Sequence, residues 1–444
     1  MSIFDEYRSK LCSATEAVRR VQSGDWVDLA TNVAFPVTLE AALAERQDEL
    51  RGVKLRGNLL PGPLRCVECD PTMEHFVYQS WHCSGYERKL CAEGRAFFSP
   101  MTFRHLAWYY REHLTVDVAM LCAAPMDDDG YFNLSGALGV LRPIIETAKS
   151  VLVEVNPALP RIHGSGAERL HISEVDAVVE TAARPVMEMP PAPANDIDRA
   201  IARQIVPYVR DGATLQLGIG GIPTAVGAYL ADSDVKALGM HTELCSDGYL
   251  ELYKAGKLTN ARKTLHTGKG VLALAVGTRA LYDWLDDNPD ILGCSIEYVN
   301  DPYIIAQNDK LISINGCLNA DLYGQVCSES VGTRQISGSG GQLDFVEGAI
   351  RSKGGRSFLC MSSTFTDKSG ALHSRILPQL GGDIVTTPRS VACDIVTEYG
   401  VAELIGKSTW ERAEALISVA HPDFRDGLIK EAEAQRIWLP SSKR

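Results

Sequence analysis

Two glutamates and two glycine-rich loops are the residues of this 444-residue chain whose types and spacing could perform covalent acyl chemistry. Glu243 lies in the segment GMHTELCSDG, just after the expected strand VKALGM, and Glu297 lies in SIEYVNDP. A carboxylate near oxyanion-stabilising N–H groups can attack an activated acyl carbon and keep the acyl energy in an anhydride or thioester. That chemistry could move coenzyme A between acids. A solvated surface charge is the alternative for each glutamate, and residue chemistry alone leaves the two near parity.

The first glycine loop is the segment GIGGIP, which follows the expected strand TLQL and precedes the expected helix TAVGAYL. Its residues are Gly218, Ile219, Gly220, Gly221, Ile222 and Pro223. A dinucleotide fingerprint would need a third glycine where Pro223 stands. A tight structural turn is a second interpretation. The third is an oxyanion hole or phosphate cradle, because N–H groups at a helix N-terminus favour anions.

The second glycine loop precedes the expected helix FVEGAI, and it contains Gly338, Gly340 and Gly341. Two such loops on one side of the chain make a purely structural role for both less convincing. Together they could hold one long ligand at two points.

Alternation of buried strands and helices predicts the elements that position these residues. The expected strands include WVDLA, VKLRGNLL, AKSVLVEVN, TLQLG, VKALGM, VLALAVG, DKLISIN, SFLCMSS and DIVTT at residues 383–387. β-branched runs that alternate with helices are typical of a parallel α/β sheet. Ligands of such sheets gather at the carboxyl ends of the strands.

The chain also reads as two similar halves. VQSGDWVDLATN from Val21 parallels VRDGATLQLGIG from Val209, with a helix expected to end at Gly24 in one and Gly212 in the other. The paired glycines are 188 residues apart, and Pro36 and Pro223 are 187 apart, which indicates a duplication. A proline cluster predicts a linker between the halves. We therefore expect two similar open α/β domains, at residues 1–187 and 198–444, joined by a linker at residues 188–197.

Composition excludes several classes of protein. The chain is 45% hydrophobic and 23% charged with a net charge of −12, which argues against nucleic acid or an anionic membrane as the main partner. The sequence has no recognisable signal peptide or membrane span, so a cytoplasmic location is expected. The twelve cysteines should then be free thiols. Cys66 and Cys69 form a CxxC pair, but a second close pair is missing, which disfavours zinc.

The motifs together resemble the acetyl-CoA hydrolase/transferase family of class I CoA-transferases, in particular its 4-hydroxybutyrate and butyrate:acetate CoA-transferases. The resemblance runs over almost the whole chain. It rests on these segments, in family order: ATEAVRRVQSGDWV, EVNPALPRIHG, LQLGIGGIPTAV, LGMHTELCSDG, YVNDP, ISINGCLNADLYGQVCSES, GSGGQLDF and IVTEYGVAELIGKS.

This resemblance implies a site between the two domains and a role for each candidate. Glu243 would be the nucleophile, and Asn300 would orient the acyl or thioester group. Gly218 to Ile222 would contact CoA and the acyl oxygen, while Gly338, Gly340 and Gly341 would lie beside the CoA chain. Glu297 would then be structural. The implied reaction is ping-pong through a glutamyl-CoA thioester, with acyl-CoA as substrate, no permanently bound cofactor, no metal, and a homodimer or higher homo-oligomer.

The acid is the least determined part of this prediction. Acetate, butyrate or 4-hydroxybutyrate fits the resemblance, but LLPGPLRCVECD has no clear counterpart, and Cys245 and Cys317 stand where pocket residues are expected. A C4–C5 dicarboxylate such as succinate or itaconate therefore stays open, with Arg65, Arg104 or Arg334 as a partner for its second carboxylate. Two other functions also stay open: acyl-CoA hydrolysis at the same site, and CoA binding without catalysis.

Overall fold

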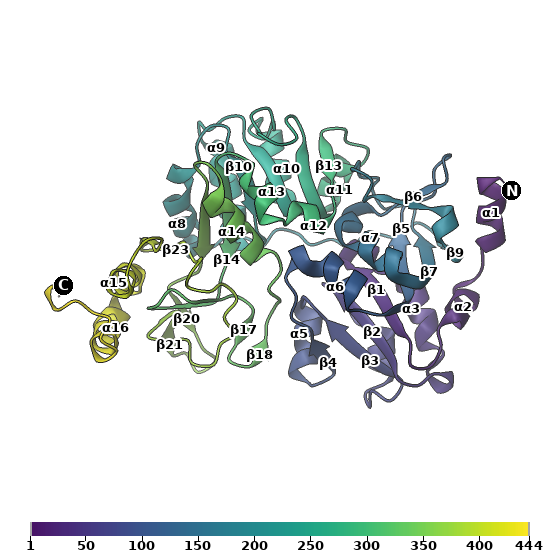
Figure 1. The fold of residues 1–444 in the computed structure, drawn as a ribbon, viewed down its shortest axis with the longest axis horizontal. Helices are drawn as coiled ribbons and strands as arrows, with labels where there is room; N and C mark the ends of the chain where they lie inside the picture. Colours follow the sequence, from purple (N-terminus) through teal and green to yellow (C-terminus); the bar gives the residue numbers. More distant parts are fainter. Residues whose placement is uncertain (1, 443–444) are drawn as a thin grey trace. The chain divides into compact units, whose positions relative to one another are not determined.

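A computed structural model describes residues 2–442 of the chain (Figure 1). Contacts within the chain cluster into two compact units. The first runs to Met189 and also contains Glu243–Cys245 and Val271–Val299. The second contains Pro190–Thr242, Ser246–Gly270 and the chain from Asn300 onward. The predicted domain boundaries, at residues 187 and 198, stay a prediction. No helix among the described residues is long and apolar enough to cross a membrane.

The first sheet has seven strands, all paired in parallel. Their order across the sheet is β4 (Ala96–Phe98), β3 (Phe76–Ser80), β2 (Val53–Asn58), β1 (Trp26–Thr31), β5 (Val116–Ala123), β7 (Ala148–Val155) and β9 (Ala177–Glu180). Strands β1 and β5 are buried along almost their whole length, which explains their continuous apolar runs.

The second sheet has eight strands. Their order is β13 (Ile291–Gly293), β12 (Gly270–Ala275), β11 (Gly239–Cys245), β10 (Thr214–Leu217), β14 (Leu311–Gly316), β19 (Arg356–Cys360), β23 (Asp394–Thr397) and β24 (Gly400–Glu403). Strand β24 is antiparallel to β23, whereas β10 pairs in parallel with both β11 and β14.

The two sheets follow the same strand order, which confirms the prediction of two similar α/β halves. In each sheet the first strand in sequence lies at the centre, with the next three on one side and the later ones on the other. Gly24 and Gly212 both adopt positive φ, at +86° and +72°. The prediction that a helix ends at each glycine is wrong, because the preceding 3-10 turns end four residues earlier, at Arg20 and Tyr208.

Helices connect the strands of both sheets. In the amino-terminal part they are α1 (Ile3–Lys10), α2 (Ala14–Ala17), α3 (Val37–Ala44), α4 (Arg65–Cys69), α5 (Gly85–Ala92), α6 (Leu106–Glu112) and α7 (Leu138–Thr147). Later helices are α8 (Asp196–Ile205), α9 (Gly221–Asp232), α10 (Asp247–Lys254), α11 (Arg279–Leu285), α12 (Ile296–Val299), α13 (Pro302–Ala306), α14 (Gln342–Arg351), α15 (Thr409–Val419) and α16 (Pro422–Ala434).

Short pieces complete the fold. Paired strands outside the main sheets are β6 (Tyr131–Asn133) with β8 (Arg169–His171), β15 (Asn319–Asp321) with β16 (Val326–Cys327) and β22 (Ile376–Leu377), β17 (Ser330–Val331) with β18 (Arg334–Gln335), and β20 (Thr364–Thr366) with β21 (Leu372–Ser374). The 3-10 turns are η1 (Val18–Arg20), η2 (Asn32–Ala34), η3 (Gln47–Glu49), η4 (Phe103–His105), η5 (Ser135–Ala137), η6 (Ile172–Glu174), η7 (Val206–Tyr208) and η8 (Pro440–Ser442).

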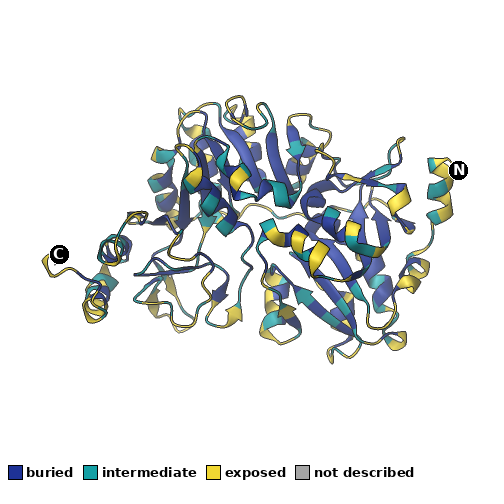
Figure 2. Ribbon diagram, viewed as in Figure 1, coloured by how far each residue is buried: buried dark blue, intermediate teal, exposed yellow. Residues whose placement is uncertain are grey.

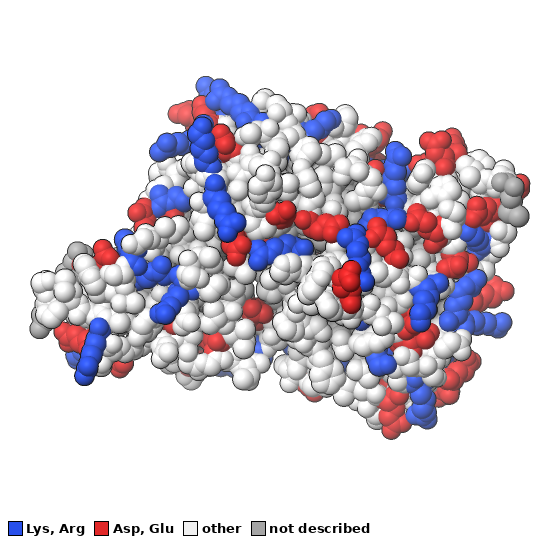
Figure 3. Space-filling view, viewed as in Figure 1, with Lys and Arg blue, Asp and Glu red and all other residues white. Residues whose placement is uncertain are grey.

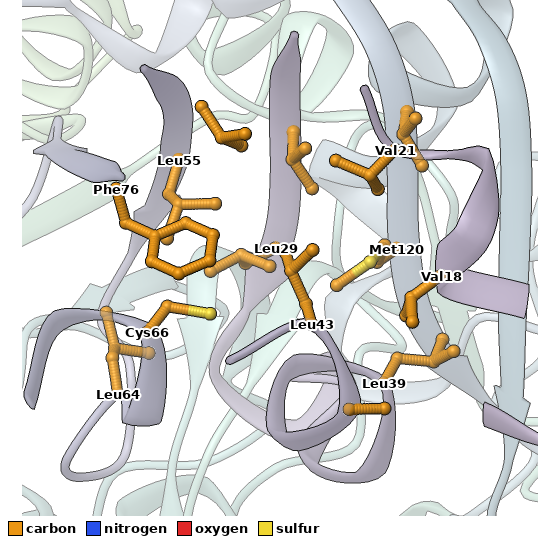
Figure 4. Close-up of a cluster of buried hydrophobic side chains, with 14 of the residues drawn as sticks. Val18, Val21, Leu29, Leu39, Leu43, Leu55, Leu64, Cys66, Phe76 and Met120 are labelled. Atoms are coloured by element: carbon orange, nitrogen blue, oxygen red, sulfur yellow. The ribbon is translucent and has the colours of Figure 1, made fainter. Parts of the chain in front are cut away.

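Apolar side chains from strands and helices interlock to form the cores. In the first unit, Leu29, Leu55 and Phe76 of the sheet pack with Leu39 and Leu43 of α3 (Figure 4). In the second, α15 and α16 pack buried side chains with those of β19 and β23. Figure 2 shows the strands of both main sheets largely buried, whereas the helices are exposed on one side. This burial is the main favourable term that fixes the strands.

Three sequence expectations need correction. The strand expected at VKALGM begins only at Gly239 and continues to Cys245, so Glu243 lies inside β11 and not after it. The segment at residues 383–387 is not a strand, and its Ile384 and Val385 are 48% and 41% exposed. Glu297 does not end a strand, because it lies in the short helix α12.

Candidate active site

Glu243 lies in the carboxyl-terminal half of β11. The strand is buried up to Thr242 and becomes partly exposed at Glu243. The parallel register pairs Thr214 with Gly239 and Leu215 with Met240, so β10 and β11 run side by side in the same direction. β10 ends at Leu217, directly before the first glycine loop. The glutamate and the loop therefore both stand toward the carboxyl ends of neighbouring parallel strands, the edge where α/β sheets bind ligands.

Side chains pin β11 just before the glutamate. The Met240 N–H donates to Asn260 Oδ1 at 2.8 Å, and its carbonyl accepts from Lys263 Nζ at 2.7 Å. Lys263 is buried and also donates to the Lys269 carbonyl at 2.7 Å. A buried ammonium satisfied by carbonyls holds this strand in place. Neither residue is recognisable from the sequence, because nothing local in the segment NARK signals a contact with a strand 20 residues earlier.

His241, two residues before Glu243, is a buried packing residue. Its side chain points into the core with no exposed surface, and its ring centroid lies 6.2 Å from that of Phe345 on α14. This environment favours a packing role for His241 over a catalytic one.

The first glycine loop forms the N-terminus of α9. The Gly218 N–H donates to the Ile314 carbonyl at 2.9 Å, which anchors the loop on β14. Gly220 caps the helix at φ +115°, a conformation that side-chain-bearing residues rarely adopt. A Cβ at Gly221 would lie 2.2 Å from Asp198 Oδ2, so a larger residue there would have to displace the Asp198 side chain. The first N–H groups of α9 cannot pair within the helix, which suits them to bind an oxyanion.

A polar network joins the strands next to this loop. Gln216 Oε1 on β10 accepts from Ser313 Oγ at 2.7 Å and from Asn315 Nδ2 at 3.0 Å, both on β14. Gln216 Nε2 donates in return to Asn315 Oδ1 at 3.1 Å. The network joins β10, which leads into Gly218, to β14, whose Ile314 carbonyl accepts the Gly218 N–H. Gln216 and Asn315 are 99 residues apart and gave no joint signal in the sequence.

The equivalent helix in the first unit demonstrates what such a terminus binds. α3 follows β1 as α9 follows β10, and its first turn holds the buried carboxylate of Glu154. The N–H groups of Thr38 and Leu39 donate to Glu154 Oε2 at 2.8 and 3.1 Å, and Arg184 pairs with the other oxygen. In the first half of the chain, the strand–loop–helix unit thus binds a carboxylate of the protein itself, that of Glu154.

Asn300 and the second glycine loop are brought together by Asp344. Asn300 is fully buried, and its Nδ2 donates to Asp344 Oδ2 at 3.1 Å. Asp344 lies in the first turn of α14, whose N-cap is Gly341. Gly338, Gly340 and Gly341 are all buried. Asp344 stands in the segment GSGGQLDF, but the sequence alone does not reveal its contact with Asn300.

Glu297 has a different environment from Glu243. It forms a two-point ion pair with Arg111, at 2.9 and 3.3 Å, and its side chain is 37% exposed. Arg111 also pairs with Glu146 at 2.9 Å, and these contacts raise the pKa of its guanidinium. Glu297 is thus part of a surface ion-pair network. This environment distinguishes it from Glu243, although residue chemistry alone made the two glutamates about equally good candidates for the nucleophile.

The remaining candidates lie in ordinary environments. Cys66 is buried on α4, where its N–H donates to Glu40 Oε1 at 2.8 Å and burial raises the pKa of its thiol well above the usual value. The described residues contain no group of three or more potential ligands arranged to hold a metal. Arg65 and Arg334 are exposed, and Cys245 is buried. Charges of both signs are interspersed on the face shown in Figure 3.

Family models match both parts of the chain. Residues 2–190 match the acetyl-CoA hydrolase/transferase N-terminal domain, and residues 277–432 match the C-terminal domain. The chain is 48% identical to the butyryl-CoA:acetate CoA-transferase of Anaerostipes caccae, over 100% of both proteins. It is 40% identical to the 4-hydroxybutyrate coenzyme A transferase of Clostridium kluyveri, over 96% of this chain and 97% of the relative.

Solved structures agree with these matches. RipA from Yersinia pestis superposes with a TM-score of 0.90 at 37% identity, over 98% of this chain and 100% of RipA. By contrast, the acetyl-CoA hydrolase of Kluyveromyces lactis is only 27% identical, over 94% of this chain and 88% of the hydrolase. The chain belongs to the acetyl-CoA hydrolase/transferase family.

Proposed function

We propose that this enzyme transfers CoA between a short-chain acyl-CoA and a free carboxylic acid, with Glu243 as the nucleophile. The observation that carries the proposal is the position of Glu243: it emerges from burial near the carboxyl end of β11, while the neighbouring parallel strand β10 ends in the glycine loop that caps α9. This is the edge of the sheet at which a carboxylate and oxyanion donors can act on one substrate.

The reaction proceeds by ping-pong steps in which each bond is exchanged for another. Glu243 attacks the acyl carbonyl of the donor, and the C–S bond breaks to give an acyl-glutamyl anhydride and CoA thiolate. The thiolate attacks the glutamyl carbonyl, which yields a glutamyl-CoA thioester and releases the donor acid. The acceptor carboxylate then attacks the thioester, and the same two steps run in reverse. The energy of the thioester bond is conserved throughout.

The loops stabilise the charges that develop in these steps. Backbone N–H groups at Gly220 and Gly221 face the oxyanions of the tetrahedral intermediates, and losing one such donor typically costs about 100- to 1000-fold in rate. Asn300, oriented by Asp344, positions the acyl or thioester group. The second glycine loop, with Gly338, Gly340 and Gly341, holds the CoA chain. Ile219 and Ile222 of the first loop contact the CoA substrate.

The acid belongs to the short-chain class. Two relatives, 48% and 40% identical, carry names that specify butyryl-CoA with acetate and 4-hydroxybutyrate, which makes acetate, butyrate and 4-hydroxybutyrate the first acids to assay. Succinate and itaconate are the dicarboxylates to include. Arg65 and Arg334 support a dicarboxylate poorly, because both are exposed. Hydrolysis is the less favoured activity, because the acetyl-CoA hydrolase of Kluyveromyces lactis is only 27% identical to this chain.

The test combines a trap with an acid panel. The enzyme is incubated with acetyl-CoA and then reduced with borohydride, which converts a glutamyl-CoA thioester into a stable alcohol on one peptide. We expect the modified peptide to contain Glu243. Thiol release at full rate without any acceptor acid indicates a hydrolase instead, and tight CoA binding without acyl exchange across the panel indicates a non-catalytic binding protein. Either result, or a trap on another residue, contradicts the proposal.

The working state proposed for the enzyme is a cytoplasmic homodimer or higher homo-oligomer that needs no permanently bound cofactor. All twelve cysteines are free thiols, as a reducing compartment requires. Light scattering of the purified protein measures the oligomeric state, and a molar mass near 48.4 kDa would contradict it.

A further inference from the structure

Arg375 is a half-buried cation without a carboxylate partner. It stands directly before β22, and its Nη1 donates to the Leu318 carbonyl at 3.0 Å. That is its single side-chain hydrogen bond among the described residues, and no described carboxylate lies within ion-pair distance. The Arg375 N–H donates to the Ser363 carbonyl, and the N–H and hydroxyl of Ser363 donate to the carboxylate of Glu398. A guanidinium has five N–H donors, so most of its donors stay available.

Two other partly buried arginines of this protein, Arg184 and Arg356, are paired with acids. Arg184 pairs with Glu154, and Arg356 pairs with both Asp394 and Glu403. The pKa of Arg356 is raised by these bonds, whereas burial lowers the pKa of Arg375. A cation that is withdrawn from water and has no anion beside it is costly unless a ligand supplies the anion.

Arg412 offers the closest internal comparison. It is also partly buried without a carboxylate, and its pKa is also lowered by burial. However, its guanidinium donates to three backbone carbonyls, those of Tyr323, Arg389 and Lys407. Arg412 is thus satisfied by the fold itself, and Arg375 is not.

The location of Arg375 places this cation near the proposed site. Cys317 and Leu318 come directly after the carboxyl end of β14, and the charge of Arg375 acts on the Cys317 thiol. β14 is the strand to which Gly218 of the first glycine loop is bonded. Arg375 therefore lies toward the same carboxyl edge, within the second unit. Its guanidinium also lies 4.9 Å from the ring of Phe365, which supports the planar group from one side.

We propose that Arg375 binds a phosphate group of the CoA moiety. The inference rests on the proposed CoA transfer. CoA is the polyanionic part of the substrate, the protein as a whole carries a net charge of −12, and a guanidinium fork matches phosphate oxygens at two points. The 3′-phosphate and the diphosphate bridge share this chemistry, and the experiment separates them.

The experiment compares Arg375→Met with Arg412→Met as a matched control, and with Arg375→Lys. Methionine keeps the length and apolar contacts of the side chain and removes its charge. We expect Arg375→Met to raise the KM for acetyl-CoA about 10- to 100-fold, because losing hydrogen bonds to a charged group weakens binding by about that factor. The change in kcat should be much smaller. Lysine should give an intermediate KM, since it keeps the charge without the fork. Arg412→Met should lower thermal stability and leave this KM unchanged.

Truncated substrates identify the phosphate. If Arg375 binds the 3′-phosphate, wild type and Arg375→Met should have equal KM values for acetyl-3′-dephospho-CoA. If it binds the diphosphate, the difference should persist with that thioester and vanish with acetyl-pantetheine. The proposal is wrong if the difference persists with acetyl-pantetheine, if the KM for the acid rises instead, or if Arg375→Met leaves the KM for acetyl-CoA within about twofold of wild type.

A binding measurement keeps the result independent of catalysis. Calorimetry with CoA itself should show the same loss of affinity in Arg375→Met, even if wild type transfers no acyl group. A protein that binds CoA through Arg375 without transfer contradicts the proposed function alone. A protein that transfers acyl groups equally well with and without the guanidinium contradicts this inference alone. If Arg375→Met does not fold, Arg375→Lys provides the same comparisons.

Discussion

Asn300 and Asp344, 44 residues apart in sequence, are joined in the interior by a hydrogen bond of 3.1 Å from the amide Nδ2 to the carboxylate Oδ2. Both side chains are fully buried. The bond ties Asn300, within the second unit, to the first turn of α14, which follows the second glycine loop. Because a carboxylate accepts but cannot donate, the bond fixes which end of the Asn300 amide faces it. Asp344 is therefore a positioning residue for Asn300.

Replacing Asp344 by Asn should remove this orientation. An amide at position 344 can pair with either end of the Asn300 amide, so we expect kcat to fall about 10- to 100-fold while the KM for acetyl-CoA changes little. Asp301→Asn is the matched control: Asp301 caps α13, and asparagine caps equally well, so its kcat should match wild type. An unchanged kcat in Asp344→Asn, or a loss only in stability, would show that the contact is merely structural.

The two glutamates should respond very differently to loss of charge. Glu243→Gln removes the proposed nucleophile, and we expect a loss of about 1000-fold or more in transfer, measured by acetate exchange from acetyl-CoA. Glu297→Gln weakens only the surface pair with Arg111 and should cost about 0.2–1 kcal/mol in stability without loss of activity. Comparable activities of the two variants would exclude Glu243 as the nucleophile.

The sheets were predictable from the sequence, but strand identity was not always local. Residues 383–386 and 394–397 are both Asp-Ile-Val-Thr. The second copy forms β23, paired with β19 on one side and β24 on the other. The first copy precedes Pro388 and leaves Ile384 and Val385 exposed, while Asp383 accepts bonds from Asn319 and Gly332. Tertiary pairing therefore determines which of the two identical tetrapeptides forms a strand, and no local sequence pattern can predict this.

The site was predictable only in part, for a similar reason. The glycine loops and Glu243 are contiguous motifs, so the sequence displayed them directly. Asp344, Gln216 and Arg375 matter through partners at a distance: 44 residues to Asn300, 99 to Asn315, and 57 to Leu318. Such contacts follow from the folded sheet order and leave no periodic or spacing signal in a single sequence.

The close approach of Gly221 and Asp198 can be tested as a pair. An alanine Cβ at position 221 would lie 2.2 Å from Asp198 Oδ2, the oxygen that accepts the Asn195 N–H at the start of α8. Displacing it breaks the reciprocal cap, so Gly221→Ala should cost about 1–2 kcal/mol in the free energy of unfolding and should lower transfer activity. Asp198→Ala removes the clash, so the double variant should lose less stability than the two single losses predict. Additive losses from denaturant unfolding would show that the clash has no effect.

His82 should make stability depend on pH. Burial lowers the pKa of its imidazole from 6.5 to about 4, and the ring packs 5.5 Å from that of Phe103. In the unfolded chain this histidine takes up a proton below about pH 6.5, whereas the folded protein keeps it neutral down to about pH 4. The folded state should therefore lose stability as the pH falls through this window, by at most about 3 kcal/mol, and this contribution should be constant above it.

His82→Gln should flatten this part of the curve of unfolding free energy against pH. His113→Gln, at an exposed position, should retain the wild-type curve. If His82→Gln keeps the wild-type slope between pH 4 and 6.5, the folded protein must already accept the His82 proton, and the buried neutral imidazole is excluded.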